Sequence, residues 1–125
     1  MTSGIEHLRV EDVLLIAEEL LPEVVIRDAG VIASAVGRPH SSVFGKPAYP
    51  TLTLQAAALL HSLVRGHALL DGNERLAWAS ARVLLLMNSV ELTYDIDEAE
   101  AMMLAAARGD IDAAEIASQV EAWID

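Results

Sequence analysis

Two stretches of this sequence are apolar on nearly every side of a helix, and this feature restricts the fold more than any other. Residues 56–60 read Ala-Ala-Ala-Leu-Leu within a helical segment 51–65, and segment 74–88 carries Leu76, Val83 and Leu84. A helix without a polar face has to be surrounded by other elements. The chain also has 21 alanines and only 4 % aromatic residues, which favours closely packed helices over strands. We therefore predict an all-α bundle with these two helices at its centre.

Further helices are predicted by apolar residues at helical spacing and by helix-start signals. Asp28 can accept a hydrogen bond at a helix start. The pairs Asp97–Glu100 and Asp112–Glu115 have the spacing of a capping box. Pro22, Gly37 and Gly109 provide stops. The sequence thus predicts about six helices and no strand. In addition to the two central helices, they cover residues 10–21, 28–36, 97–108 and 116–124.

Residues 40–50 form a loop of about eleven residues just before the first central helix. Gly45, Pro47 and Pro50 break any helical pattern there. Loops of this length are long for a compact domain and are often functional, although a plain connector fits equally well. Phe44 and Tyr49 are either apolar anchors for a partner or residues that pack the loop.

Composition narrows the class of protein. A length of 125 residues predicts one domain, 1–125. The absence of cysteine excludes a disulfide scaffold, and a net charge of −11 argues against nucleic acid as the main partner. The longest apolar runs are far short of the roughly 20 residues that span a bilayer, and the charged N-terminal residues do not resemble a signal peptide. We expect a soluble cytoplasmic protein without membrane contact.

The nine residues from His67 to Arg75, between the two central helices, carry the chemistry. Histidine titrates near neutral pH and can accept a proton from a hydroxyl. Asp71 offers a hard oxygen ligand for Mg²⁺, and Gly72 allows a ligand to approach the backbone. The amides at the next helix start and the Arg75 guanidinium can bind phosphate. Asn73 is predicted to cap that helix. These groups suit phosphoryl transfer, although Asp71, Gly72 and Asn73 could also form a simple turn.

This segment resembles the motif of the Fic/Doc superfamily, His-x-Phe-x-Asp/Glu-Gly/Ala-Asn-x-Arg. Residues 48–92 and 27–45 resemble the Doc (death-on-curing) branch, so the likeness covers about half of the chain. It implies a Fic-like fold with a short flap before the central helix. It also implies a toxin of a type II toxin–antitoxin system, neutralised by a Phd-like antitoxin that inserts a helix into a groove.

By this resemblance the protein transfers a phosphoryl group from ATP or another nucleoside triphosphate to a Ser or Thr hydroxyl. The implied target class is translation elongation factor Tu, so translation would be inhibited. His67 would be the general base, Asp71 would hold Mg²⁺, and Arg75 would bind phosphate. The implied phosphate-binding set is Gly72, Asn73, Glu74 and Arg75. The implied flap, which docks an extended target segment by strand addition, is Lys46, Pro47, Ala48 and Tyr49.

The sequence departs from the family pattern at three places. Ala68 and Leu69 stand where Pro and Phe are frequent, and both changes are mild because Leu69 is still apolar. Glu74 stands where Doc proteins usually have Lys. A carboxylate about 4 Å from a phosphate repels it by roughly 4 kcal/mol at an effective dielectric near 20. Glu74 could point to solvent, favoured by the helix dipole, or pair with an arginine and act as a brake.

Two other functions therefore stay open. One is transfer of AMP or another nucleotide, which is disfavoured because Trp78 falls where the longer Fic motif has a second arginine. The other is a catalytically degenerate protein that only binds an antitoxin. Arg65 and Arg82 either add positive potential near the motif or form structural salt bridges. The remaining histidines, His7, His40 and His61, are interpreted as structural.

Overall fold

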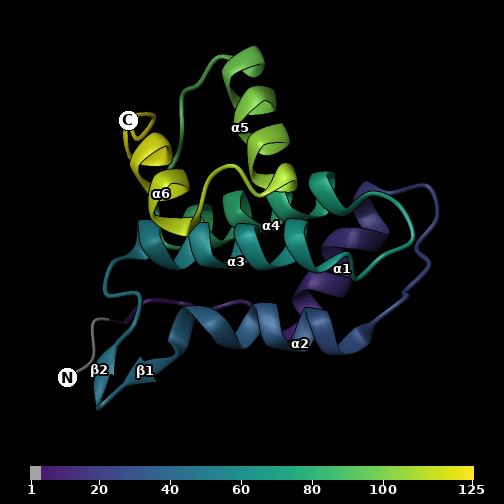
Figure 1. The fold of residues 1–125 in the computed structure, drawn as a ribbon, viewed down its shortest axis with the longest axis horizontal. Helices are drawn as coiled ribbons and strands as arrows, with labels where there is room; N and C mark the ends of the chain where they lie inside the picture. The colour runs from purple at the N-terminus through teal and green to yellow at the C-terminus, as the bar shows by residue number, and fades with distance from the viewer. Residues whose placement is uncertain (1–3) are drawn as a thin grey trace.

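The computed structural model describes residues 4–125, and within them the chain forms six α-helices (Figure 1). This confirms the predicted all-α class. The helices are α1 (Val10–Leu20), α2 (Ala29–Gly37), α3 (Leu52–Gly66), α4 (Asn73–Met87), α5 (Ile96–Arg108) and α6 (Ala113–Glu121). None of the helices in this part of the chain is long and apolar enough to cross a membrane.

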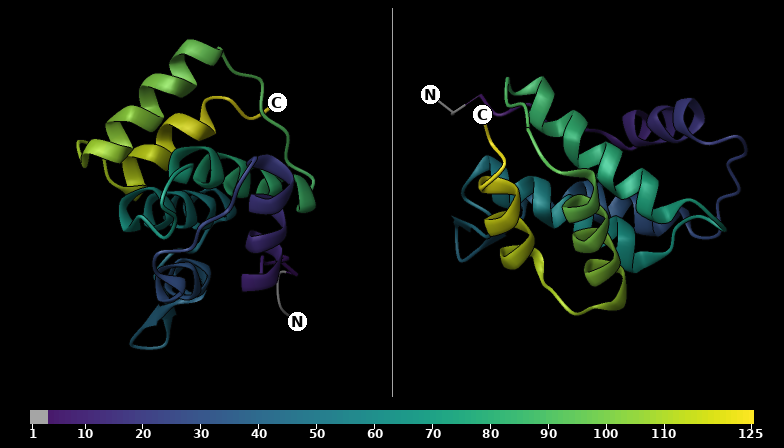
Figure 2. Two further views of the ribbon diagram at one scale, coloured as in Figure 1. Left: turned by 90° about the vertical axis from the view of Figure 1, so that its right-hand side faces the viewer. Right: turned by 90° about the horizontal axis from the view of Figure 1, so that it is seen from above.

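Helices α3 and α4 lie side by side at the centre of the bundle, as the sequence predicts. Helices α5 and α6 cover one side of this pair, and α2 lies on the other (Figures 1 and 2). Helix α3 contacts α2, α4, α5 and α6. Its residues from Ala56 to Leu60 are all at most 2 % exposed. The hydrophobic core includes side chains from all six helices, among them Val13, Ile32, Leu59, Leu76, Met102 and Ile116.

The loop before α3 contains a small β-hairpin, which the sequence pattern does not predict. Strands β1 (Ser42–Val43) and β2 (Lys46–Pro47) pair antiparallel, with Val43 opposite Lys46. Phe44 and Gly45 form the turn, and both have positive φ angles, 52° and 78°. Two-residue hairpin turns favour such angles but usually place Asn or Asp first. Phe44 therefore gave no turn signal in the sequence.

The helix starts match the predictions only in part. Asp28 accepts a hydrogen bond from the Gly30 amide, and Asp112 and Glu115 form the expected capping box. Helix α5, however, begins at Ile96 rather than at residue 97. Its cap is the Asp95 carboxylate, which accepts from the Asp97 and Glu98 amides, so the predicted Asp97–Glu100 box is wrong. Asp95 has the extended backbone that a cap requires.

The most informative test of the core is Leu69, because this residue fixes the loop between α3 and α4. Its side chain is 0 % exposed, whereas the adjacent Leu70 is 65 % exposed. We expect Leu69→Ala to lower the free energy of unfolding by about 2–5 kcal/mol through lost burial and a residual cavity. Leu70→Ala, the matched control, should change it by about 0.5 kcal/mol or less. Urea unfolding measures the free energy of unfolding of both variants. Equal losses of stability would contradict the conclusion that Leu69 fixes the loop.

Candidate active site

The loop between α3 and α4 changes direction at two residues with left-handed backbone. His67 ends α3 with a φ angle of 52°, and Gly72 begins α4 with a φ angle of 89°. A Cβ atom added at Gly72 would lie 2.8 Å from two methyl carbons of Leu21. Glycine is therefore favoured here by its backbone angle and by close packing. The sharp turn brings His67 back to the start of α4.

A segment from far earlier in the chain holds the backbone of this loop in place. The amides of Arg27 and Asp28 both donate to the Ala68 carbonyl, at 2.7 and 3.1 Å, and the Leu70 amide donates to Val25 at 2.9 Å. Ala68 and Leu69 are buried, while His67, Leu70 and Asp71 are exposed. The loop thus has a fixed backbone and presents its chemically active side chains to solvent.

Asn73 stabilises the loop instead of capping α4, so the predicted cap is wrong. Its side-chain Oδ1 accepts from the Leu69 amide at 3.0 Å, and its Nδ2 donates to the Leu69 carbonyl at 2.9 Å. Both backbone groups of the buried Leu69 are satisfied by this one amide. Asn73 is itself the first residue of α4, and Gly72 at the cap position has no side chain to offer.

The start of α4 consequently lacks a side-chain acceptor. The first amides of a helix have no partner within the helix and attract anions. No side-chain capping bond is made at this helix start, and the Asp71 carboxylate accepts from the Gly72 amide, one residue before α4, at 2.9 Å. The uncapped helix start can therefore receive an anionic group from a ligand.

The loop residues predicted from the sequence line one pocket of about 330 Å³. Its lining includes all the motif residues assigned to catalysis and phosphate binding. These are His67, Asp71, Gly72, Asn73, Glu74 and Arg75. The structure thus brings together an imidazole, a carboxylate, a guanidinium and an uncapped helix start.

Arg75 reaches from the start of α4 towards α1. Its Nη2 donates to the Leu20 carbonyl at the end of α1, at 3.1 Å. A guanidinium has five N–H groups, so this bond leaves most of its donor capacity for other partners. The side chain is exposed and lines the loop pocket. Arg75 is thus anchored to the end of α1 while it lines the loop pocket.

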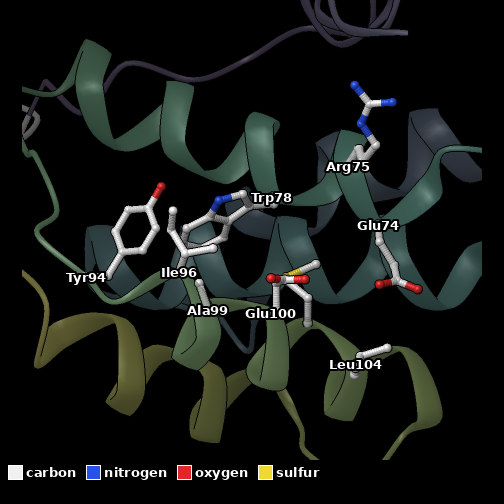
Figure 3. Close-up of a pocket in the computed structure, with 9 residues that line it drawn as sticks. Glu74, Arg75, Trp78, Tyr94, Ile96, Ala99, Glu100 and Leu104 are labelled. Atoms are coloured by element: carbon white, nitrogen blue, oxygen red, sulfur yellow. The ribbon is translucent and has the colours of Figure 1, made fainter.

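Glu74 is exposed and points away from Arg75 (Figure 3). Across residues 4–125 it forms no ion pair, so the structure does not show the arginine-paired brake. Its place in the first turn of α4 is favourable for a carboxylate because of the helix dipole. Glu74 also lines the loop pocket. Its negative charge would therefore oppose an anion in this pocket.

Asp71 is suited to hold Mg²⁺ together with a nucleotide, but not to form a protein-only metal site. No group of three or more metal-binding side chains occurs in the described part of the chain. Mg²⁺ commonly takes one or two carboxylates and completes its shell with waters and substrate phosphates. The exposed Asp71 at the pocket edge fits that pattern.

A second pocket, which the sequence does not predict, adjoins the first between α4 and α5. It has a volume of about 350 Å³, and Glu74 and Arg75 line both pockets. Trp78 and Tyr94 form its aromatic end, with their ring centroids 5.2 Å apart (Figure 3). The spacing of Glu74 and Trp78, four residues on one helix, is the signal that could have revealed it.

The predicted flap and the loop between α3 and α4 lie at opposite ends of α3 (Figure 1). A 15-residue helix is about 22 Å long at 1.5 Å per residue. In the flap, Lys46, Pro47 and Ala48 are exposed, whereas Tyr49 is half-buried and accepts a hydrogen bond from Arg38 at 2.7 Å. Tyr49 thus packs the base of the flap, while Phe44 at its tip is fully exposed.

The fold and this site define a Fic/DOC protein. The family model described as "Fic/DOC family" matches residues 7–85, which include the whole loop from His67 to Arg75. The chain is also 45 % identical over 118 residues to "Toxin Doc" of Mycolicibacterium smegmatis (strain ATCC 700084 / mc(2)155). That alignment covers 92 % of this chain and 91 % of the relative. The chain belongs to the Fic/DOC family, and the resemblance to the Doc branch is confirmed. The roles of individual residues stay predictions.

The Asn73 side chain provides a direct test of how the loop is held. We expect Asn73→Ala to lower the free energy of unfolding by about 1–3 kcal/mol, because it leaves two backbone groups of Leu69 unpaired. Asn73→Asp keeps the acceptor and loses the donor, so its loss should be smaller. Asp71→Ala, at an exposed neighbour, is the control. If the alanine variants at 73 and 71 unfold alike in urea, the assigned contact is wrong.

Proposed function

We propose that this protein is a Doc-type toxin that acts as one domain and transfers a phosphoryl group from a nucleoside triphosphate to a Ser or Thr hydroxyl. The proposed target class is elongation factor Tu, so the consequence is inhibited translation. The observation that carries the proposal is the loop pocket, where His67 and Arg75 face one space at the uncapped start of α4. Membership of the Fic/DOC family and a relative named Toxin Doc support it.

In this mechanism His67 accepts the proton of the target hydroxyl as its oxygen attacks the terminal phosphorus. The new O–P bond forms while the bond to the bridging oxygen breaks, and the nucleoside diphosphate leaves with that oxygen and its electron pair. Arg75 and the first amides of α4 bind the phosphoryl oxygens as negative charge develops. Asp71 would hold a Mg²⁺ ion, which supplies charge neutralisation when bound.

The proposed partner is a Phd-like antitoxin, and the proposed location is the cytoplasm. The pocket between α4 and α5 offers apolar surface for such a partner, because Ile96 and Leu104 are 70 % and 46 % exposed. An amphipathic helix binds such a groove with its apolar face. Because this pocket shares Glu74 and Arg75 with the loop pocket, a helix bound there would also obstruct the donor.

Glu74 favours a second candidate function, in which the protein only binds its antitoxin. A carboxylate replaces the usual lysine on the pocket rim, and it weakens phosphate binding. In this case the loop keeps its shape without useful affinity for a nucleotide. Nucleotide binding by the wild-type protein separates the two candidates.

Replacement of the proposed base tests the transfer reaction. We expect His67→Ala to reduce ATP-dependent labelling of a cell lysate by about 10²–10⁴-fold, because general base catalysis typically contributes that much. His7→Ala, at an exposed histidine outside the loop, is the control. Label carried on the terminal phosphate should transfer, whereas label on the α-phosphate should not. Equal labelling by wild type and His67→Ala would reject the assigned base, and transfer of the α-label would indicate nucleotidyl transfer.

Replacement of Glu74 tests whether its charge limits the site. We expect Glu74→Lys to bind ATP with Mg²⁺ about tenfold more tightly or better, since a repulsion is replaced by an attraction. Glu74→Gln, which only removes the charge, should give an intermediate Kd. Calorimetric titration of the purified proteins measures all three. Identical affinities would show that Glu74 does not affect the donor, and binding by the lysine variant alone would identify a degenerate enzyme.

A further inference from the structure

An open groove of about 580 Å³ lies between α2 and α3, lined by residues other than those of the loop pocket. Arg38 of η1 (Arg38–His40), a 3-10 turn, meets His61, Ser62 and Arg65 of α3 there. Ser34 and Asp28 complete the polar lining from the α2 side. Neither the predicted chemistry nor the proposed function uses this groove.

Arg38 is half-buried and bonded only to neutral groups. Its Nε donates to the Tyr49 hydroxyl at 2.7 Å, and its Nη1 donates to the Ser62 hydroxyl at 3.0 Å and to the Ala58 carbonyl at 3.5 Å. Its Nη1 also lies 2.8 Å from Nδ1 of His61. None of these bonds uses Nη2. In residues 4–125 no carboxylate forms an ion pair with this guanidinium.

Arg65 is a second cation without a carboxylate partner in the described part of the chain. It is exposed, and its Nη1 donates to the Ala107 carbonyl at 2.6 Å. Asp28 lines the same groove, and its carboxylate accepts a hydrogen bond from the Gly30 amide at the start of α2. The chain has 19 acidic and 8 basic residues, so carboxylates are plentiful. Arg38 and Arg65 outnumber Asp28, the one carboxylate in the lining, so the charges that line this groove sum to +1 with His61 neutral.

His61 adds a neutral donor to this groove. Burial lowers the pKa of His61, the charges of Arg38 and Arg65 lower it further, and Asp112 opposes them. The imidazole is therefore unprotonated at neutral pH. Its Nδ1 faces an N–H of Arg38 and must act as an acceptor, so the proton lies on Nε2. An anion bound beside this ring would stabilise the imidazolium and raise the pKa again.

We propose that the groove between α2 and α3 is a binding site for a phosphate-class anion. Arg38 and Arg65 supply charged donors, and Ser34 and Ser62 supply hydroxyls on two sides of the groove. Paired guanidinium forks with hydroxyl donors match the several oxygens of a phosphate group. The ligand is inorganic phosphate or the terminal phosphoryl group of a nucleotide. This proposal goes beyond the proposed function and does not require that the protein transfers a phosphoryl group.

A titration with inorganic phosphate, followed through the His61 ring signals by NMR, tests the site. His61→Gln assigns those signals among the four histidines. In the wild type we expect a saturable shift, and a higher His61 pKa at saturation. Arg65→Gln should weaken binding about tenfold or more, because a charge-assisted hydrogen bond is lost. Arg65 is preferred over Arg38 because it is exposed and its loss leaves the base of the flap intact.

Two matched arginine variants separate this groove from the loop pocket. Arg75→Gln and Arg82→Gln remove the same charge elsewhere and should leave the His61 response unchanged. The proposal is overturned if the His61 shift is lost in Arg75→Gln but kept in Arg65→Gln. It is also overturned if the shift rises linearly with phosphate and does not saturate. ATP added to the phosphate-saturated Arg75→Gln protein distinguishes the two possible ligands. If ATP displaces phosphate from the groove, the ligand is a nucleotide; if it does not, the ligand is inorganic phosphate. The phosphate titration does not measure phosphoryl transfer. An absence of lysate labelling would therefore reject the proposed function and leave the proposed anion site untouched.

Discussion

The hydrogen bonds between residues 25–28 and the loop after α3 are the contacts on which the candidate site depends. Ala68 and Leu69 are buried in a loop outside the helices, where Leu69 forms an isolated antiparallel β-bridge with Ile26. Their backbone groups are paired with Val25–Asp28 and with the Asn73 side chain. Unpaired, these groups would disfavour burial of the loop. Because the pairing holds, His67 and Arg75 face one pocket even though Leu69 replaces the usual Phe.

Local charge, rather than net charge, decides what this acidic protein can bind. Charges on exposed groups are largely screened beyond about 8 Å at physiological ionic strength. An anion at the start of α4 therefore responds mainly to the helix amides, Arg75 and Glu74. The first two attract it and the third repels it. The same reasoning applies at the α2/α3 groove, where Arg38 and Arg65 act at short range despite a net charge of −11.

The sequence predicts what depends on local pattern, and it misses what depends on distant partners. The central helices follow from their apolar runs, and the grouping of His67 with Arg75 follows from a short loop between them. The hydrogen bonds of residues 25–28 to this loop could not be predicted, because their partners lie about forty residues away in the chain. Asn73 has the chemistry of a cap, yet it bonds Leu69 since the loop backbone needs both of its polar atoms. Phe44 carries no turn signal, so Gly45 is the one residue of this turn whose type favours a positive φ angle, and Tyr49 contacts Arg38 at the base of the hairpin.

The length of α3 restricts how a target could use both the flap and the loop pocket. The helix separates them by about 22 Å, and an extended chain advances about 3.3 Å per residue. A target segment that adds to the flap would need roughly seven further extended residues to bring a hydroxyl to His67. A folded helix or a tight turn covers too little distance over that number of residues. A single target segment bound at both the flap and His67 would therefore have to span about 22 Å, which seven extended residues cover and seven helical residues do not.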